Sequence, residues 1–390
     1  MSRPSAPRCY LDYNASAPLR PAVREAMIAV LDLAGNPSSV HGHGRACRSA
    51  VEVARRSVAA LAGARPAEVV FTSGGTEANA LALSGLPVAA TVVSAIEHES
   101  VLAAAPGALR LPVDGQGVAD LAALGALLAR LPGLVLVSLM LVNNETGVIQ
   151  PVAEAAALVH RHGGLLHCDA IQAAGRLPLD RAALGADLLS LSAHKLGGPA
   201  GVGALLADER LTLRPLLCGG GQERGRRAGT ENLVGIAGFG RAAELAPDDL
   251  DAAPRLAAWR DRLERAVRAM VPEVTVCGAG AARVANTSCL ALPGVAAGTQ
   301  VMALDLAGVA VSAGAACSSG KVRSPHVLAA MGFGPELAGG AIRVSLGWAS
   351  SEDDTARFVA AWGEMAARLR RPPLPCMTRR EAALSGTAQP

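Results

Sequence analysis

Short apolar runs that end in polar side chains recur along the first two thirds of the chain, and this pattern limits the fold more than any other feature. The runs lie at 68–85, 91–100, 134–147, 163–172 and 187–195. Helical patterns also occur, and the first two predict helices at 20–35 and 44–63. The first of these is expected to end at Gly35. Strands that alternate with helices favour a mostly parallel sheet covered by helices on both faces. The sequence therefore predicts an α/β protein.

A change of composition near residues 245–255 predicts a boundary between two domains. A helical pattern at 256–270 and strand-like pieces such as "VTVCG" and "NTSCLALPG" follow it, as is typical of a smaller α+β domain. We predict a large domain over 14–250 and a small domain made of 1–13 and 251–370. The Pro-rich segment 371–390 is predicted to be a mobile tail.

Charge and composition argue against several classes of partner. The net charge is +3 and aromatic residues make up 2%, so nothing indicates nucleic-acid binding. The longest apolar run, 134–142, is too short to span a bilayer, and the N-terminus "MSRPSAPRCY" has no apolar signal core. The cysteines show no C-x-x-C spacing, so no metal site is expected. We expect a cytoplasmic protein with free thiols.

Polar residues gather where the predicted strands end. In parallel sheets, ligands bind beyond the carboxyl ends of the strands. We therefore predict one binding site formed by the residues at these ends: Thr76, His98, Asn144, Asp169, Gln172, Ser192, His194 and Lys195.

Lys195 is one of only two lysines in a chain that otherwise uses arginine as its basic residue. Arginine can replace lysine as a surface charge but not as an amine nucleophile, because its guanidinium stays protonated. The other lysine, Lys321, lies among small residues without a strand-end cluster. Lys195 is therefore a candidate covalent catalyst, although a surface lysine is the alternative.

The segment "TSGGTE" at 72–77 is a glycine turn that opens a helix, with Gly75 and Thr76 at its start. Amide groups at a helix N-terminus form an anion cradle, here without the sequence of a P-loop or a dinucleotide fingerprint. A phosphate is the expected ligand, and Ser192, His194 and Thr230 are further candidate donors.

Asp169 ends an apolar strand and could simply cap a turn. A carboxylate held against a protonated pyridine nitrogen has a more specific effect, because it makes that ring an electron sink. A phosphate cradle, Asp169 and a lysine nucleophile together are what pyridoxal phosphate requires. His98 is the expected stacking partner of the ring, unless it is a solvent-facing turn histidine.

Nine motifs in order give the chain a family resemblance from about Tyr10 to Glu352. They are "YLDYNASAP", "GNPSSVHGHGR", "FTSGGTEAN", "EHES", "NNETGVIQP", "HCDAIQAAG", "SAHKLGGPAGVG", "GGGQERGRRAGTEN" and "GAACSSG". The chain resembles cysteine desulfurases of the NifS/IscS type, which are class V, fold-type I pyridoxal-phosphate enzymes. The resemblance implies that 14–250 binds the cofactor and that the enzyme converts L-cysteine to L-alanine.

The resemblance also implies a role for each matching residue. Lys195 matches the Schiff-base lysine, Asp169 the partner of the ring nitrogen, Gln172 the partner of the ring hydroxyl and His98 the stacking, proton-shuttling histidine. Phosphate ligands are matched by Thr76, Ser192 and His194, and by Thr230 from the other subunit of a homodimer. Asn144 and Arg343 match the groups that hold the substrate carboxylate.

Cys317 matches the sulfur acceptor, on a Gly- and Ser-rich loop of the small domain. A sulfur-acceptor protein or iron–sulfur scaffold is the implied partner. The chain departs from the family pattern at Ala200, in the "AGAAC" loop and after about residue 371. A related class V enzyme such as a selenocysteine lyase, and a non-catalytic scaffold, remain alternatives; Cys317 favours the desulfurase, and the intact catalytic set argues against a scaffold.

Overall fold

The larger of two sheet systems is a seven-stranded sheet that provides the platform for the predicted site. The computed structural model describes residues 9–314 and 325–369 of the chain. The strand order is β2-β8-β7-β6-β5-β3-β4, and β8 runs against the other six strands. The strands are β2 (Val69–Thr72), β3 (Ala90–Ser94), β4 (Leu109–Leu111), β5 (Val135–Ser138), β6 (Leu165–Asp169), β7 (Leu188–Ser192) and β8 (Gly203–Ala207).

Helices cover both faces of this sheet because alternate strand residues project to opposite sides. Residues of α2, α5, α6 and α7 pack with Val69 and Val137 on one face. Residues of α3 and α4 pack with Val70 and Leu136 on the other. The helices of this part are α1 (Pro21–Ala29), α2 (Gly42–Leu61), α3 (Gly75–Ser84), α4 (Glu99–Ala104), α5 (Leu121–Leu128), α6 (Val152–Arg161) and α7 (Leu233–Asp251), with short 3-10 turns η1 (Pro66–Glu68), η2 (Ala193–Lys195) and η3 (Gln222–Gly225).

A smaller sheet system packs beside the first. Its four-stranded sheet has the order β12-β13-β10-β9, and β1 pairs with β11 in parallel. Phe358 and Trp362 of α12, both fully buried, anchor its core. The strands are β1 (Cys9–Tyr10), β9 (Thr275–Val276), β10 (Thr287–Ala291), β11 (Val309–Ala310), β12 (Ser312–Ala313) and β13 (Ala341–Ser345). The helices are α8 (Ala253–Met270), α9 (Ala297–Leu306), α10 (His326–Ala330), α11 (Pro335–Gly339) and α12 (Glu352–Leu369).

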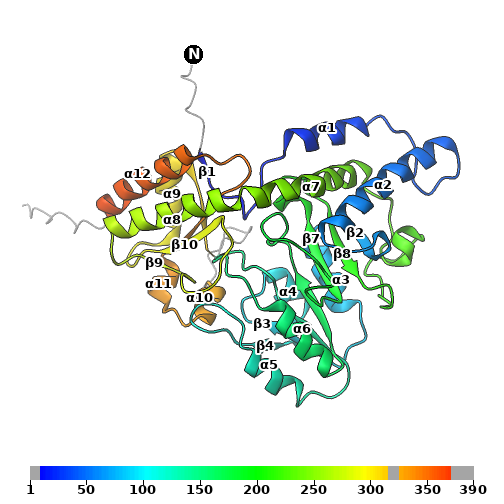
Figure 1. Ribbon diagram of the computed structural model, residues 1–390, viewed down its shortest axis with the longest axis horizontal. Helices are drawn as coiled ribbons and strands as arrows, with labels where there is room; N and C mark the ends of the chain where they lie inside the picture. The colour runs from blue at the N-terminus through cyan, green and yellow to red at the C-terminus, as the bar shows by residue number, and fades with distance from the viewer. Residues whose placement is uncertain (1–8, 315–324, 370–390) are drawn as a thin grey trace, which may run out of the picture.

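The predicted α/β fold with a mostly parallel sheet is confirmed. Two predicted helices have other limits in the structure: α1 ends at Ala29 and not at Gly35, and α2 runs from Gly42 to Leu61 and not over 44–63. Leu31, where the apolar pattern continues, is 61% exposed, so the extra turn has no core to pack against. The region 245–255 is helical, with only Ala252 between α7 and α8, and these two helices lie in line across the two sheet systems (Figure 1). The domain limits stay a prediction, and the segment 371–390 lies outside the described residues.

Within the described ranges, no helix combines the length and the apolar character needed to cross a membrane.

Candidate active site

The carboxyl edge of the large sheet brings together three of the predicted residues. Asp169 is the last residue of β6, and Lys195 ends the η2 turn that directly follows the neighbouring strand β7. His98 is the N-cap of α4, four residues after the end of β3. Parallel strands end at the same edge, which is why residues far apart in sequence meet here.

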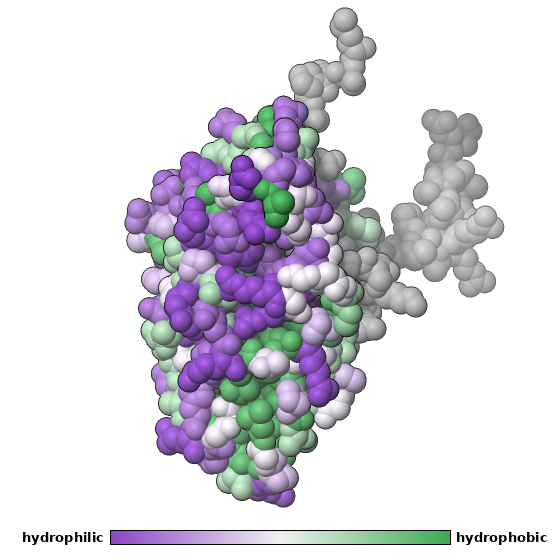
Figure 2. Space-filling model, turned by 90° about the vertical axis from the view of Figure 1, so that its right-hand side faces the viewer, coloured by the Kyte–Doolittle hydropathy of each residue, from purple (hydrophilic) through white to green (hydrophobic). Residues whose placement is uncertain are grey.

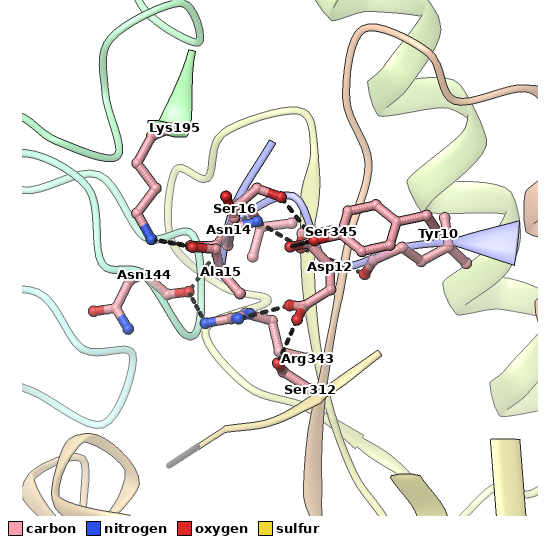
Figure 3. Close-up of polar contacts among 12 residues, drawn as sticks. Tyr10, Asp12, Asn14, Ala15, Ser16, Asn144, Lys195, Ser312, Arg343 and Ser345 are labelled. Atoms are coloured by element: carbon pink, nitrogen blue, oxygen red, sulfur yellow. Dashed lines mark hydrogen bonds and ion pairs between the residues drawn. The ribbon is translucent and has the colours of Figure 1, made fainter. Parts of the chain in front are cut away.

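The amine of Lys195 points to backbone carbonyl groups of the N-terminal segment (Figure 3). Its Nζ donates to the backbone oxygens of Asn14 at 2.6 Å and Ala15 at 2.8 Å. Burial, followed by the positive charges of Arg343 and Arg176, lowers the pKa of Lys195 to about 7. A large fraction of this amine is therefore the neutral, nucleophilic form near pH 7.

The carboxylate of Asp169 is buried and held at both oxygens. Oδ2 accepts a hydrogen bond from Nδ2 of Asn79 at 2.8 Å, and Oδ1 accepts one from the backbone N–H of Ile171 at 3.0 Å. The side chain is thus an oriented negative charge at the edge of the sheet.

His98 caps α4 through its ring. Its Nδ1 accepts from the backbone N–H of Ser100 at 3.1 Å and lies 2.8 Å from the Ser100 hydroxyl. The residue reaches the surface, yet neighbouring protein displaces part of the hydration of the ring, which lowers its pKa. Neutral imidazole is therefore favoured.

The start of α3 has the geometry of an anion cradle. Its N-cap, Gly74, has no side chain to cap the first amide groups. A Cβ on Gly75 would lie 2.3 Å from Cδ1 of Ile171 and 3.4 Å from Cβ of Ser192, so Ser192 adjoins the helix N-terminus. Thr76, the next residue, is exposed and free to face a ligand.

The other two predicted phosphate ligands, His194 and Thr230, have no described contact with the N-terminus of α3. His194 is 3.3 Å from the Ser16 hydroxyl, and burial followed by the charge of Lys195 lowers the pKa of His194 to about 4. Thr230 is exposed in the segment before α7, where Arg227 binds Glu77 in the first turn of α3 at 2.9 Å. Thr230 is expected to act on the cofactor of a second subunit, so a single chain does not test its role.

Gln172 is held by two groups that the sequence analysis did not identify. Its Nε2 donates to the backbone oxygen of Asn14 at 2.9 Å, and its Oε1 accepts from Nη1 of Arg176. Burial lowers the pKa of Arg176 to about 10, which leaves it a cation at neutral pH. Arg176 thereby orients the amide of Gln172 so that its nitrogen is the donor, with one hydrogen used by Asn14.

Arg343 reaches the site from β13 of the small sheet (Figure 3). Its Nη2 pairs with Oδ1 of Asp12 at 2.8 Å, and its Nη1 donates to the backbone oxygen of Asn144 at 3.1 Å. Its Nε has no hydrogen-bond partner among the described residues. The second Asp12 oxygen accepts from Ser312 at 2.8 Å. A substrate carboxylate at Arg343 would therefore compete with Asp12.

Glu145 is a buried carboxyl beside this group that sequence reasoning missed. Burial raises its pKa to about 8, opposed by the charge of Arg343. Its Oε2 has no hydrogen-bond partner in the part of the chain described. Glu145 is therefore a neutral acid over most of the physiological range.

Several of these contacts could not have been found from the sequence. Asn14 acts on both Lys195 and Gln172 through its backbone oxygen, which no side-chain pattern reports. Asp12 and Asn79 stood inside quoted motifs, but only the folded chain pairs them with Arg343 and Asp169. The predicted sulfur acceptor, Cys317, lies outside the described residues, as does Lys321.

Comparison with known proteins identifies the family of the chain. The chain matches the model described as aminotransferase class-V over residues 9–358. It is 47% identical over 354 residues to a cysteine desulfurase of Cereibacter sphaeroides, covering 87% of this chain and 90% of the relative. A cysteine desulfurase of Klebsiella pneumoniae is 42% identical over 373 residues, or 93% of each chain. The X-ray structure of a NifS-like protein from Rickettsia africae has a TM-score of 0.85 at 34% identity, over 92% of this chain and 99% of the other. The chain therefore belongs to the aminotransferase class-V family and, within it, to the cysteine desulfurases of the NifS/IscS type.

Proposed function

We propose that this chain is a pyridoxal-phosphate-dependent cysteine desulfurase, which converts L-cysteine to L-alanine and takes the sulfur as a persulfide on Cys317. The observation that carries the proposal is that one edge of the sheet bears both the buried amine of Lys195 and the oriented carboxylate of Asp169. Lys195 has a pKa of about 7, and Asp169 is held at both carboxylate oxygens. Such perturbed and oriented ionisable groups are typical of functional sites.

The residues present fit the cofactor. The uncapped N-terminus of α3, with Ser192 beside Gly75, supplies amide and hydroxyl donors for a phosphate. Lys195 would hold the cofactor aldehyde, and Asp169 would pair with the ring nitrogen. When bound, pyridoxal phosphate supplies an electron sink for the charge left at the substrate α-carbon.

The chain's own groups account for binding and proton movement. Arg343 binds the substrate carboxylate in place of Asp12, aided by the amide of Asn144. The neutral Nζ of Lys195 takes the α-proton, because its low pKa leaves it unprotonated at neutral pH. His98 presents a neutral ring for proton transfer near the substrate.

Sulfur transfer balances without any other reactant. The Cys317 thiolate attacks the substrate sulfur and forms an S–S bond, while the substrate C–S bond breaks. The electron pair stays with the β-carbon, which takes up a proton and leaves in alanine. The enzyme thiol thus becomes a persulfide for a sulfur-acceptor or iron–sulfur scaffold protein.

We also propose a homodimer located in the cytoplasm. Large apolar side chains are exposed along residues 19–40, as expected for a surface that a second copy covers. Ile28, Leu31 and Val40 are 51%, 61% and 88% exposed. The face seen in Figure 2 also bears a hydrophobic patch. The free cysteines of the described residues fit a reducing compartment.

The test is a single turnover of purified enzyme with L-cysteine, followed by mass spectrometry of its peptides. We expect one added sulfur on the peptide that contains Cys317, and none in the Cys317→Ser variant, since an alcohol cannot accept the sulfur. The Cys218→Ser variant, which changes an exposed cysteine, is the matched control and should behave as the parent. Sulfur found on another peptide would contradict the mechanism.

A further inference from the structure

We propose that Asn79 and Ser100 are positioning residues that fix His98 as its Nε2–H tautomer and link it to Asp169. The proposed function identifies the reaction in which His98 would act; the hydrogen bonds that fix its ring do not depend on that function. Its evidence is a continuous set of hydrogen bonds from β6 through α3 to the first turn of α4.

Asn79 is the centre of this set. It is fully buried on α3, and its single Nδ2 donates both to Oδ2 of Asp169 at 2.8 Å and to Oγ of Ser100 at 2.9 Å. An amide nitrogen has two hydrogens, so both are used. The opposite orientation of the amide would set its oxygen against the Asp169 carboxylate, acceptor against acceptor. The orientation is therefore fixed by Asp169.

The amide oxygen supports this reading. Oδ1 of Asn79 has no hydrogen-bond partner among the described residues, although it is buried. An unpaired buried carbonyl destabilises the folded state, because its lost hydration is not replaced. A side chain kept there for packing alone would be better apolar, so the two donor bonds are the feature that explains an asparagine.

Ser100 passes the orientation on to His98. Its hydroxyl accepts from Asn79, so its own hydrogen is free for Nδ1 of His98, 2.8 Å away. The backbone N–H of Ser100 also points to Nδ1, at 3.1 Å. Two donors aimed at Nδ1 leave it as an acceptor and place the hydrogen of the neutral ring on Nε2.

A protonated His98 is disfavoured by the same contacts. A hydrogen on Nδ1 would face the N–H of Ser100. Loss of hydration has the largest effect on the ring and lowers its pKa; Lys195 and His326 act in the same direction, whereas Asp169 and Glu99 oppose them. His98 therefore enters the reaction as a hydrogen donor at Nε2.

The experiment is nitrogen NMR of the imidazole rings in protein labelled with 15N-histidine and loaded with pyridoxal phosphate. The chain has eight histidines, and the His98 signals are those lost in His98→Gln. In the parent protein at pH 7.5 we expect a protonated Nε2 and an unprotonated Nδ1. A protonated Nδ1 would overturn the proposal.

The variants test the residues. Ser100→Ala removes one hydrogen bond to the neutral ring, so the titration midpoint of His98 should rise by roughly 0.5–1 pH unit. Asn79→Ala should shift it in the same direction. Ser100→Thr keeps the hydroxyl and should leave the midpoint unchanged. Ser57→Ala, which changes a half-buried serine on α2, should also leave it unchanged. An unchanged midpoint in Ser100→Ala would refute the role of Ser100.

These readings do not depend on turnover. If L-cysteine yields no alanine while His98 shows the expected tautomer, the proposed function fails and the positioning role stands. If alanine forms while Nδ1 is protonated, the opposite holds.

Discussion

The low pKa of Lys195 comes from its surroundings in the folded chain. Burial removes the hydration that stabilises an ammonium ion, and two guanidinium groups add to the effect. The carbonyls of Asn14 and Ala15 keep the amine oriented in either protonation state. The sequence could single out Lys195 because lysine is so rare in the chain, but it could not report the pKa.

Replacing Arg343 should raise the pKa of Lys195. Removing this positive charge in Arg343→Gln favours the ammonium form, by about 0.5–1 pH unit. The readout is the pH dependence of reductive methylation at Lys195 in cofactor-free protein, which mass spectrometry resolves because the chain has two lysines. Arg343→Lys keeps the charge and is the control. A lower midpoint in Arg343→Gln would contradict the account.

Glu145 should make the protein less stable as the pH rises. Its folded-state pKa of about 8 exceeds the ordinary 4.5, so the folded protein holds a proton that the unfolded chain releases. The contribution is complete below pH 4.5 and falls away toward pH 8. Glu145→Gln removes it and should flatten the decline in the free energy of unfolding between pH 5 and 8, by on the order of 1–3 kcal/mol.

Urea unfolding at pH 5, 6.5 and 8 measures this slope. Glu154→Gln, in the first turn of α6, is the control, and its slope should match that of the parent. Equal slopes for the parent and Glu145→Gln would show that Glu145 is not protonated in the folded state.

At the scale of elements, the sequence predicted the long strands of the large sheet but not the two-residue strands of the small sheet system. The strands β2, β5, β6 and β7 lie inside the predicted runs, and β3 begins one residue before its run, at Ala90. An apolar run bounded by polar residues and glycine has few other solutions. Two-residue strands such as β1 and β12 have no pattern of their own. They form because Cys9 and Ser312 meet partners that are remote in sequence.

A side chain at Gly75 should disturb the turn into α3. A Cβ there would lie 2.3 Å from Cδ1 of Ile171, whose backbone N–H holds Asp169. Gly75→Ala should weaken binding of pyridoxal phosphate roughly five- to tenfold, measured by absorbance titration of cofactor-free protein. Adding Ile171→Val, which removes the clashing methyl, should restore much of the affinity.

Gly298→Ala is the matched control for this change. It lies in the first turn of α9, where an added Cβ meets no atom within 4 Å. Normal affinity in Gly75→Ala would show that the cradle does not depend on this close approach.

At the scale of the whole molecule, the site joins the two sheet systems. Lys195 and Asn144 lie in segments that follow strands β7 and β5 of the large sheet, and Arg343 lies in β13 of the small one. The strand-end pattern predicted Lys195 and Asn144, whereas Arg343 was predicted only by the resemblance, because periodicity cannot pair elements nearly 200 residues apart. The pairing of Arg343 with Asp12 was unforeseen, because it depends on β13 and the N-terminal segment meeting in the folded chain.

The proposed dimer predicts that residues 19–40 form part of the subunit interface. Leu31→Glu and Val40→Glu should convert the dimer to a monomer, because each places a charge on an apolar surface. Light scattering after gel filtration gives the mass. Leu306→Glu changes an equally exposed leucine on α9, at 88%, and should leave the dimer intact. A parent protein that is monomeric at micromolar concentration would contradict the proposal.

The most direct test of the central claim is the release of alanine from L-cysteine by the purified, cofactor-loaded protein. Alanine is the product that distinguishes desulfuration from other reactions of an amino acid at such a site. The account predicts alanine and persulfide sulfur in equal amounts in the first turnover, and none from Lys195→Ala. Pyruvate in place of alanine, or alanine formed at the parent rate by Lys195→Ala, would contradict it.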